Sequence, residues 1–590
     1  MKIKKEKQEK KAKSFIEDMM ETDSMKLFTM ISSYYLLVLI VFSIMQLLNI
    51  INLSVVQILS ISIPIIIYLL IKNNQSNKKK LITIIIYLLI TIAIPFTYNK
   101  IYDVTQDGNS YHKSAIAFIK NGWNPLYESM RSFQKKNSNV IELSEKCKID
   151  LWSEHYPKAT WIIAAVIYEM TGNIESGKCI TLVISIMFMI LVYNCLRKII
   201  DKKWSFILSL LFILNPIVLA QIFSYYVDGI MGICFAIEIL ILMCINPKEK
   251  INYKLIVSLV SIICIFVNLK YTGLLCSGII AAIYYLFWLI KYRKEKDYLS
   301  IIKRITLVFV VAFFSAVFIV GSNSYVKNTI DHHNPLYPLI GKDKVDIITT
   351  MQPKSFKNKS HIEKFVISMF SRTENTTYEK EPRLKLPIRP YRAEIDELYI
   401  PDVRLGGFGP LFALAFIITI LLFIPAAFIL YKKEKENLKY VILPFISIII
   451  SMILVGESWW ARYVPQLYYI SIGTILLILY LSKYYKNIIF KLLPFILIIP
   501  IAINVGCFIY VDYDELKIFK TITSDIKELK KRNNPKLKLT NYDLYGYLYT
   551  LNDNNVKYTL VDELKDEEKV YMYSWRLEVK RDDKELSKTN

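Results

Sequence analysis

A carboxylate with chemically useful neighbours stands at the start of the first long polar segment of the chain. Asp107 is followed by Gly108, and Tyr111 and His112 come one helical turn later. Glycine allows a ligand to approach the backbone closely, and residues four apart in a helix share one face. A carboxylate in such a setting suits a general base. We therefore predict that Asp107 is a base, with Asp103 as the competing acid and helix capping as the alternative role of Asp107.

Two cations stand in short connections between apolar runs. Lys270 lies in NLKYTG and Arg462 in GESWWARYVPQ. Both residue types bind phosphate, arginine through a bidentate fork and lysine as a point charge. We predict that they hold a phosphate group; the alternative is that their side chains only snorkel from helix ends. The aromatic neighbours Trp459, Trp460 and Tyr463 either stack on a ligand or form an interfacial belt.

Metal and disulfide chemistry have little support in the sequence. The eight cysteines are scattered, mostly inside apolar runs and without a CxxC pair, which excludes a disulfide framework and a zinc knuckle. A divalent metal held by Asp107, His112 and His155 is an alternative, but these residues lack the short spacing typical of metal sites. We therefore expect no resident cofactor. All five histidines fall in polar segments, namely His112, His155, His332, His333 and His361.

The composition is that of a membrane protein. Hydrophobic residues make up 54% of the 590 residues, and the mean hydropathy is +0.34. A soluble domain is normally about 45 to 50% apolar and carries few uninterrupted apolar runs of about 20 residues. The net charge of +23 lies in short clusters between the apolar runs. Lipid topology explains such clusters, so we exclude a nucleic-acid partner.

The apolar runs predict an all-α polytopic fold with about thirteen membrane-spanning helices. Their ranges are 27–50, 54–71, 81–97, 178–196, 205–223, 229–245, 254–269, 272–290, 305–321, 408–430, 440–456, 464–482 and 489–510. If the amino terminus is inside, Lys and Arg concentrate in the inner connections, and the short outer connections contain only Lys270 and Arg462. The positive-inside rule therefore predicts a cytoplasmic amino terminus and an extracytoplasmic carboxyl terminus.

Three domains follow from this topology. We expect a basic cytoplasmic tail at 1–26, a transmembrane domain at 27–510 with large outer loops at 98–177 and 322–407, and a small extracytoplasmic α/β domain at 511–590. In the last domain a helical pattern precedes the strand-like pieces KYTLV, VYMYS and RLEVK. The inner connections are too short for a nucleotide-binding domain. An outward-facing enzyme therefore needs a substrate that carries its own leaving group, and a lipid phosphate is the natural candidate.

The first outer loop resembles that of the GT-C superfamily, which are integral-membrane glycosyltransferases that use polyprenyl-phosphate sugars. Asp107 to Tyr111 (DGNSY) is similar to the acidic D-x-x-x-Y motif of this superfamily. The stretch HYPKATWIIAAVIYEMTG, with Pro157 and Gly172, is similar to the returning segment and helix of the same loop. The nearest likeness is to bacterial relatives of protein O-mannosyltransferases and of the lipid A aminoarabinose transferase.

Two later motifs extend the resemblance, which covers about residues 81–590. Asn334 to Leu339 resembles an NP-[FL]-YPL element, and Arg462 with Tyr463 resembles an Arg-Tyr pair at an outer helix end. The order of these short motifs along the chain is more specific than any one of them. The chain departs from the pattern in an extra helical pair before the first outer loop and in the glycine at position 108, where many relatives have a second acid.

The resemblance implies a GT-C-like fold and an inverting glycosyltransferase. Such an enzyme moves a sugar from a polyprenyl-phosphate donor to a glycan, lipid or protein acceptor, here at the outer face of a bacterial plasma membrane. Asp107 would deprotonate the acceptor hydroxyl, and Arg462 and Lys270 would hold the leaving phosphate. Further substrate-binding candidates are Tyr111, His112, His155, Lys158, Asp228, His333, Asn334, Tyr337 and Tyr463.

Two other functions stay open at this point. A transporter or flippase of lipid-linked substrates is expected to have internal repeats and several mid-span charges, of which Glu238 is the main example. A polymerase or ligase acting on lipid-linked glycans is expected to use arginines of large outer loops. The candidates for that role are Arg372, Arg383, Arg389, Arg392 and Arg404.

Overall fold

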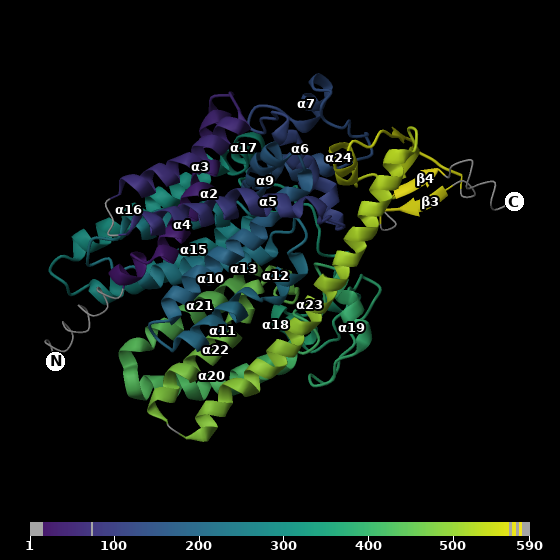
Figure 1. The fold of residues 1–590 in the computed structure, drawn as a ribbon. Coiled ribbons are helices and arrows are strands. Elements are labelled where there is room, and N and C mark those ends of the chain that lie inside the picture. The colour runs from purple at the N-terminus through teal and green to yellow at the C-terminus, as the bar shows by residue number, and fades with distance from the viewer. Residues whose placement is uncertain (1–15, 72–74, 486, 566–568, 574–576, 581–590) are drawn as a thin grey trace.

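Helices dominate the computed structural model, and one small sheet stands near the carboxyl-terminal end (Figure 1). The structure describes residues 16–71, 75–485, 487–565, 569–573 and 577–580. Most of the predicted cytoplasmic tail, at 1–15, and the end of the predicted carboxyl-terminal domain, at 581–590, lie outside the described residues.

Among the described residues, nine helical stretches are long and apolar enough to cross a bilayer. They contain α2 (Asp23–Leu47), α3 (Leu53–Leu70), α4 (Asn77–Leu88) with α5 (Ile94–Thr97), α10 (Ile180–Leu196), α15 (Tyr271–Tyr292), α16 (Tyr298–Phe314), α20 (Phe412–Glu434), α22 (Tyr468–Leu481) and α23 (Ile488–Lys531). Because each provides the length that a bilayer core requires, the prediction of a helical, multi-pass membrane protein is confirmed.

Each of the thirteen predicted ranges contains a helix, but four of these helices are too short to count as spans by length alone. They are α11 (Lys202–Ile213), α13 (Asp228–Cys244), α14 (Tyr253–Val267) and α21 (Lys439–Val455). The number of spans therefore stays a prediction.

The predicted continuous helix at 205–223 is wrong. Asn215 and Pro216 divide it into α11 and α12 (Pro216–Gln221), because the Asn215 side chain accepts a hydrogen bond from the Ile217 amide at 3.0 Å and proline favours the first helical position. Asn215 also donates to the carbonyl of Pro465 at 2.9 Å. The break gives α12 a direction of its own before the chain enters α13.

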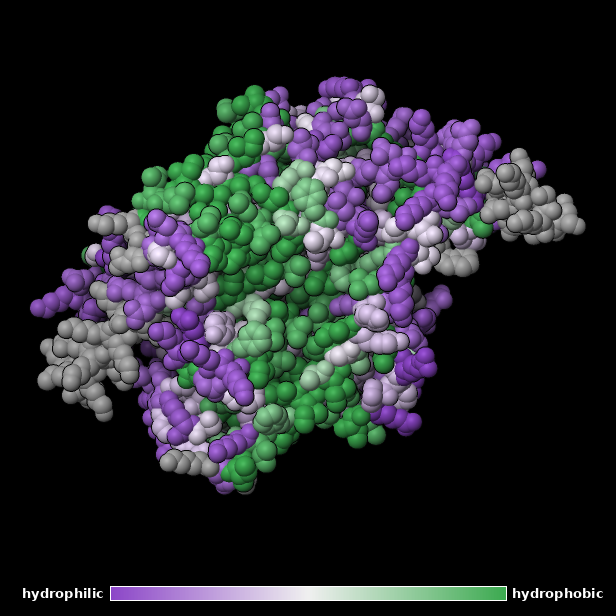
Figure 2. Space-filling view, in the orientation of Figure 1, coloured by the Kyte–Doolittle hydropathy of each residue, from purple (hydrophilic) through white to green (hydrophobic). Residues whose placement is uncertain are grey.

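The surface of the molecule supports its membrane location. Figure 2 shows a broad hydrophobic region across the middle of the visible face, between hydrophilic regions at two opposite ends. Large apolar side chains such as Ile58, Leu70 and Leu421 are mostly exposed, and Leu70 is 78% exposed. An apolar area of this extent is unusual for a soluble monomer, whereas a lipid environment covers it.

Contacts at the two ends of α10 identify two opposite ends of the helical body. At its carboxyl-terminal end, Asn194 is hydrogen bonded to Thr22 and Ser24, which lie beside the start of α2. At its other end, Glu175 contacts Thr550 of α24 (Gly546–Asp553). The start of the described chain and its carboxyl-terminal unit therefore lie at opposite ends of the body (Figure 1). Which end is cytoplasmic stays a prediction.

Shorter helices cover the end of the body that carries α24. They are α6 (Lys113–Lys120), α7 (Met130–Lys136), α8 (Ile149–His155), α9 (Ala159–Thr171), α17 (Tyr325–His332), α18 (His361–Met369) and α19 (Arg392–Asp396). Most of them belong to the predicted outer loops 98–177 and 322–407. We call this side of the molecule the α24 end.

The carboxyl-terminal unit contains a four-stranded sheet in the order β2-β1-β4-β3. Its strands are β1 (Lys536–Leu539), β2 (Thr559–Leu560), β3 (Lys569–Met572) and β4 (Leu577–Lys580). β1 pairs parallel to β2 and antiparallel to β4, with Leu537 opposite Val579, and β3 pairs antiparallel to β4. The three predicted strand-like pieces contribute β2, β3 and β4; β1 was not predicted.

The long helix α23 joins the transmembrane body to this unit without a break. It runs for 44 residues through the predicted boundary at 510, which corresponds to a length of about 66 Å. No glycine or proline interrupts VDYDELKIFK after the apolar part. The carboxyl-terminal sheet is thus carried on a continuation of a membrane helix.

Candidate active site

Asp107 lies in the first turn of a helix that another residue caps. The helix begins at Gln106, widens into a π turn at Gly108–His112 and continues as α6. The Thr105 hydroxyl accepts a hydrogen bond from the Gly108 amide at 3.2 Å, whereas the Asp107 side chain makes no capping hydrogen bond. The capping alternative for Asp107 is therefore wrong, and its carboxylate points elsewhere.

The competing acid, Asp103, is sealed inside the protein. It has no exposed surface, and it accepts hydrogen bonds from the amide and hydroxyl of Thr105 at 2.8 and 2.6 Å and from the Tyr225 amide at 2.8 Å. A Cβ atom on Gly108 would lie 2.1 Å from Asp103 Oδ2. Glycine is thus needed at position 108 for packing against Asp103, and not for approach of a ligand as the sequence suggested.

Arg462 faces Asp107 from a different part of the chain. It stands in the short turn Ala461–Tyr463 between α21 and α22, with Nη1 4.0 Å from Asp107 Oδ2 and 3.2 Å from Asp402 Oδ2. The Asp107 side chain is 30% exposed, and that of Arg462 is 10% exposed. The only other polar contact described for the Asp107 carboxylate is a hydrogen bond from the Tyr111 hydroxyl at 3.3 Å. The predicted acid and cation therefore meet at a partly open surface.

Aromatic rings surround the Arg462 guanidinium. Its Cζ lies 4.4 Å from the ring centroid of Trp460, 5.4 Å from that of Tyr463 and 5.6 Å from that of Tyr226. The rings hold the guanidinium by cation–π contact. The Nε atom is buried and has no hydrogen-bond partner. The guanidinium is thus fixed in place with part of its donor capacity unused.

A second ion pair lies beside Arg462. We call Asp107, Asp228, Lys270, Asp402 and Arg462 together the charged group. Lys270, just before α15, donates to the buried carboxylate of Asp228 at the start of α13 and lies 5.5 Å from the ring centroid of Tyr463. Gln221 donates to the other Asp228 oxygen at 3.2 Å. Lysine has three donor hydrogens, so Lys270 keeps donors for a ligand after binding Asp228.

Burial and the neighbouring charges act together on Asp107. Burial raises the pKa of the Asp107 carboxyl above its usual value, and the nearby carboxylates of Asp402 and Asp228 act in the same direction. Arg462 and Lys270 oppose the rise. A raised pKa improves the proton affinity of a carboxylate that has to act as a base near neutral pH.

His112 lies beside this group but does not carry charge. It is buried, its Nδ1 accepts a hydrogen bond from Trp161 Nε1 at 2.6 Å, and burial together with Lys270 lowers its pKa to about 3. The neutral ring with an accepting Nδ1 places its proton on Nε2. His112, a predicted substrate-binding residue, can therefore offer a ligand a hydrogen-bond donor but not a positive charge.

The other predicted site residues form a separate aromatic cluster. His155 Nδ1 is hydrogen bonded to Asn328 Oδ1 at 2.8 Å, and its ring meets those of His332 and Tyr337 edge-on. Burial lowers the pKa of His155 to about 4. The Tyr271 hydroxyl donates to the carbonyls of His155 and Tyr337. These contacts hold the loop that follows α17 against α8.

Three further candidates have local roles in the structure. Lys158 is buried and donates to the carbonyls of Glu154 and Tyr156 at 2.8 and 2.7 Å. Asn334 donates to the carbonyl of Ile340 and so closes the NPLYPL turn on itself. His333 ends α17 in a left-handed conformation and is exposed.

Sequence reasoning missed Asp402, which belongs to the charged group, and Tyr226, whose ring lies beside Arg462. Asp402 stands in an irregular part of the loop 322–407, where no periodic pattern marks it, and its carboxylate contacts Arg462. Tyr226 precedes Asp228 in SYYVDG and could have been found through that neighbour. Arg404 lies nearby as well, with its guanidinium 5.6 Å from the Trp460 ring centroid.

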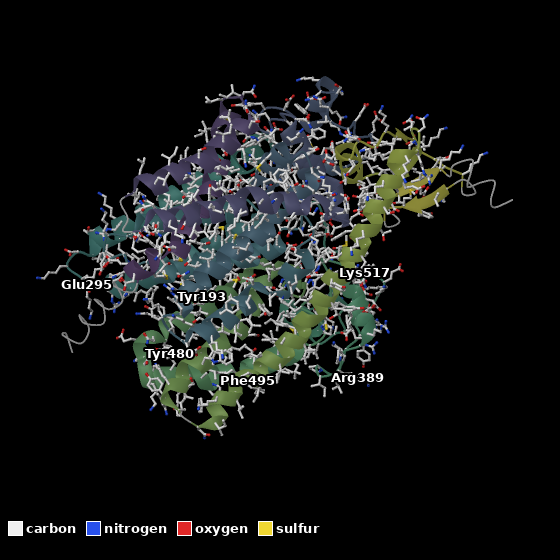
Figure 3. All side chains as sticks on the ribbon, in the orientation of Figure 1. Tyr193, Glu295, Arg389, Tyr480, Phe495 and Lys517 are labelled. Atoms are coloured by element: carbon white, nitrogen blue, oxygen red, sulfur yellow. The ribbon has the colours of Figure 1, made fainter. Side chains whose placement is uncertain are left out.

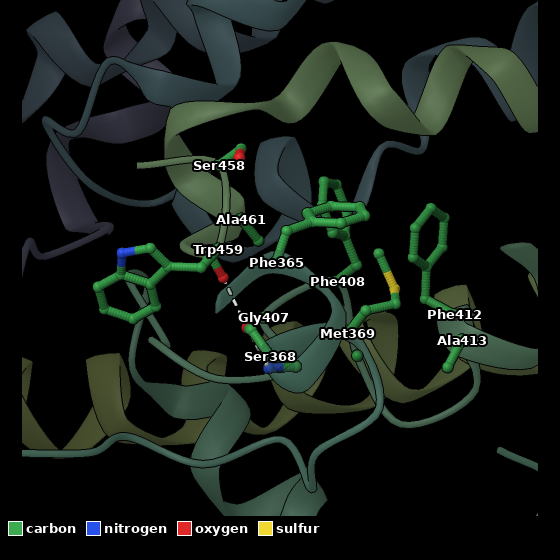
Figure 4. A pocket seen from close by; sticks show the side chains of 12 residues that line it. Phe365, Ser368, Met369, Gly407, Phe408, Phe412, Ala413, Ser458, Trp459 and Ala461 are labelled. Atoms are coloured by element: carbon green, nitrogen blue, oxygen red, sulfur yellow. Dashed lines mark hydrogen bonds between the residues drawn. The ribbon is translucent and has the colours of Figure 1, made fainter. Parts of the chain in front are cut away.

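Two pockets flank the segment 401–409. One, with an empty volume of about 230 Å³, is lined by Asp402, Arg462 and apolar residues of α12 and α23. The other, of about 280 Å³, lies between α18, the start of α20 and the turn after α21, and its lining is mostly apolar (Figure 4). In this second pocket the Ser368 hydroxyl donates to the Trp459 carbonyl at 2.6 Å. Apolar space thus adjoins the charged group.

Three other arginines of the loop 322–407 are engaged elsewhere. Arg372 and Arg389 lie over the Tyr391 ring at 3.9 and 5.1 Å, and Arg383 forms an ion pair with Glu374 at 2.9 Å. Arg389 lies at the periphery of the molecule (Figure 3). The structure does not bring these three residues to Asp107.

Among the residues that the structure describes, no group of three His, Cys, Asp or Glu side chains is arranged to hold a metal ion. The predicted trio of Asp107, His112 and His155 is divided, because His155 belongs to the separate aromatic cluster. No family model matches the chain, and no curated protein matches it.

Proposed function

We propose that this protein is a membrane glycosyltransferase of the GT-C type that moves a sugar from a polyprenyl-phosphate donor to an acceptor hydroxyl at the outer face of a bacterial plasma membrane. The observation that supports this most is the 4.0 Å approach of Arg462 Nη1 to Asp107 Oδ2. A base next to a phosphate-binding cation is what such a transfer requires, because the nucleophile and the leaving group react at one carbon atom.

The proposed reaction assigns one task to each charged residue. Asp107 accepts the proton of the acceptor hydroxyl while its oxygen attacks the anomeric carbon of the sugar. The bond between that carbon and the phosphate oxygen breaks, and the configuration at carbon inverts. Arg462 and Lys270 stabilise the negative charge on the leaving polyprenyl phosphate. His112 donates a hydrogen bond to the sugar or the phosphate from Nε2.

The surroundings of the charged group fit a lipid-linked donor. Trp460, Tyr463 and Tyr226 offer ring faces for a sugar. The apolar side chains that line the pocket at Arg462 offer a surface for the first isoprene unit. The acceptor then approaches Asp107 from the exposed side of its carboxylate.

A transporter has less support. Glu238 in α13 is fully buried, and neither of its carboxylate oxygens has a hydrogen-bond partner. The other acid of α13 is Asp228 at the helix start. The charged group at Asp107, in contrast, brings together five segments of the chain, with members at 107, 228, 270, 402 and 462. A polymerase or ligase would share the Asp107 and Arg462 chemistry and is distinguished by its donor, which carries an oligosaccharide instead of one sugar.

The test uses the full-length protein in liposomes with undecaprenyl-phosphate sugars, each carrying one radiolabelled hexose or aminopentose, and membrane extract as acceptor. We expect transfer from one of these donors and a loss of about 10²- to 10⁴-fold in turnover for Asp107→Asn, because a general base contributes that much. The matched control is Glu145→Gln, an exposed acid of the same outer segment. Unchanged transfer by the Asp107→Asn protein would refute the assignment of the base.

A further inference from the structure

The helix α24, at the far end of the chain, packs against the segment that carries Asp107. Gly546 begins α24, and a Cβ atom at this position would lie 2.5 Å from the Asn109 Cα and 2.7 Å from its carbonyl oxygen. The Tyr547 hydroxyl donates to the carbonyl of Val104 at 3.2 Å. The two segments therefore touch on both sides of Asp107 in the sequence. The Tyr547 side chain meets the backbone at Val104, and the two backbones meet at Gly546 and Asn109, where only glycine permits the distance.

Behind this contact, α24 takes part in a fully buried group of charges. Glu175 accepts from Lys113 Nζ at 2.5 Å and from Lys178 Nζ, and both lysines are buried. The Thr550 hydroxyl donates to Glu175 Oε1 at 2.7 Å and accepts from Lys113 Nζ at 3.2 Å. Lys113 begins α6, which continues directly from the π turn after Asp107.

Asn109 connects the two contacts. Its amide donates to the carbonyls of Asp103 and Thr105 at 2.7 and 2.9 Å, and its Oδ1 accepts from Lys113 Nζ at 2.9 Å. The side chain thus fixes the turn that leads to Asp107, and the backbone of the same residue rests on Gly546. A displacement of α24 would release both at once.

The rest of α24 is anchored at several other points of the first outer loop. Asp553 accepts from the Ile174 amide at 2.7 Å and from the Tyr168 hydroxyl at 2.6 Å. The hydroxyls of Tyr545 and Tyr549 accept from the amides of Ser144 and Ile141. These anchors lie outside the charged group at Asp107, and none of the side-chain contacts described for α24 is with a member of that group.

We propose that α24 is a positioning element for the base, with Gly546 and Thr550 as the residues that hold the Asp107 segment in its reactive geometry. The proposal rests on the proposed function for its catalytic consequence only. The restraint of residues 103–113 by α24 does not depend on which reaction Asp107 takes part in. The carboxyl-terminal unit is therefore part of the site, although its sheet lies at the edge of the molecule.

The experiment is amide hydrogen exchange on the full-length protein in nanodiscs, followed by transfer assays with the donor that the wild-type protein uses. The variant Thr550→Val keeps the shape and removes the hydroxyl from the charges, and Gly546→Ala forces the two backbones apart. We expect exchange in 103–113 to become about tenfold faster in both, because a hydrogen bond to a charged group is lost or displaced. Turnover should fall by a similar factor with the KM for donor unchanged.

Two controls separate positioning from loss of structure. Thr550→Ser restores the hydroxyl and should restore wild-type exchange and turnover, and Asn552→Ala on the exposed face of the same helix should change neither. Unchanged exchange in 103–113 for Thr550→Val and Gly546→Ala would overturn the proposal, as would faster exchange with full turnover. If the wild-type protein transfers no sugar from any donor, the proposed function fails, while the exchange data still decide whether α24 restrains the Asp107 segment.

Discussion

Two groups of charged residues each take members from the short stretch 103–113, and they differ in how completely their hydrogen-bonding capacity is satisfied. The sealed cluster consists of Asp103, Lys113, Glu175 and Lys178, and all four side chains are buried. The open cluster consists of Asp107, Asp228, Lys270, Asp402 and Arg462, and Asp107 is its most exposed member. Asp103 and Asp107 are four residues apart and belong to different clusters.

The number of hydrogen bonds that each carboxylate accepts distinguishes an acid that stabilises the fold from one that is available for chemistry. Glu175 receives hydrogen bonds from two lysines, from the Thr550 hydroxyl and from the Asp103 amide at 3.0 Å. Asp107 receives one neutral hydrogen bond and faces a guanidinium at the limit of an ion pair. A saturated acid holds the fold, whereas an acid with free lone pairs and open surface can accept a proton from a ligand.

The largest expected effect is on the stability of the sealed cluster. Glu175→Gln leaves the two buried lysines, Lys113 and Lys178, with Asp103 as the one acid of the cluster, so we expect a loss of about 3–5 kcal/mol in the free energy of unfolding. The measurement is the fraction of monodisperse protein after heating in detergent, with Glu169→Gln, an exposed acid of α9, as the control. A second change, Lys178→Met, should recover part of the loss; a Glu175→Gln protein as stable as the wild type would show that the cluster does not hold the fold.

The corresponding change in the open cluster should weaken binding and leave the fold intact. Arg462→Ala removes the cation that lies between Asp107 and Asp402, so we expect binding of undecaprenyl phosphate to weaken by about 2–5 kcal/mol. Arg462→Lys should recover only part of the affinity, because lysine lacks the planar fork. Binding is measured through quenching of tryptophan fluorescence in nanodiscs. The control is Arg389→Ala, because Arg389 lies over Tyr391 at the periphery of the molecule. Equal affinities of the Arg462→Ala and Arg389→Ala proteins would contradict a phosphate site at Arg462.

The distinction between the clusters could be predicted from the sequence only in part. The apolar runs located the helices, because a span needs a fixed number of apolar residues and this number is a local property. The resemblance and the position beside the membrane selected Asp107 and Arg462, which the structure brings to 4.0 Å. Asp402 and Thr550 were missed, because their roles arise from contacts with residues far along the chain, and no local spacing encodes such contacts.

For two residues, Gly108 and His112, the structure changes or narrows the role that the sequence suggested. Gly108 suggested an opening for a ligand, but it provides space for Asp103. His112 was predicted to bind substrate, and because burial and Lys270 lower its pKa it can do so only as a neutral hydrogen-bond donor. In both cases the residue type fixes which chemistry is allowed, and only the three-dimensional environment decides which of the allowed roles is used.

A smaller effect is expected in the pH dependence of transfer. Because the pKa of Asp107 is raised above its usual value, the acidic limb of the kcat/KM profile should lie at higher pH than for an ordinary aspartate and fall about tenfold per pH unit below that pKa. Arg462 opposes the rise, so Arg462→Lys, with its more flexible charge, should shift the limb further upward. A profile that stays flat down to the usual pKa of aspartate would show that another group is the base.

The smallest expected effect is on the stability of the Asp107→Asn protein, and its sign separates the two clusters most sharply. A carboxyl whose pKa is higher in the folded than in the unfolded protein favours folding when it is protonated, so stability falls as the pH rises from the unfolded pKa through the folded pKa. At a pH above the folded pKa the wild-type protein carries this cost in full. Asn has no charge to bury, so the Asp107→Asn protein should unfold at the same or a slightly higher denaturant concentration at pH 7, and the difference should vanish below the unfolded pKa. The same substitution at Asp103 replaces one of its two accepting oxygens by an NH2 group. It therefore removes the acceptor of either the Tyr225 hydrogen bond or the two Thr105 hydrogen bonds and should destabilise the protein at pH 7. If both variants lost stability equally, Asp107 would belong to the framework of the fold, and the open cluster would have no residue reserved for chemistry.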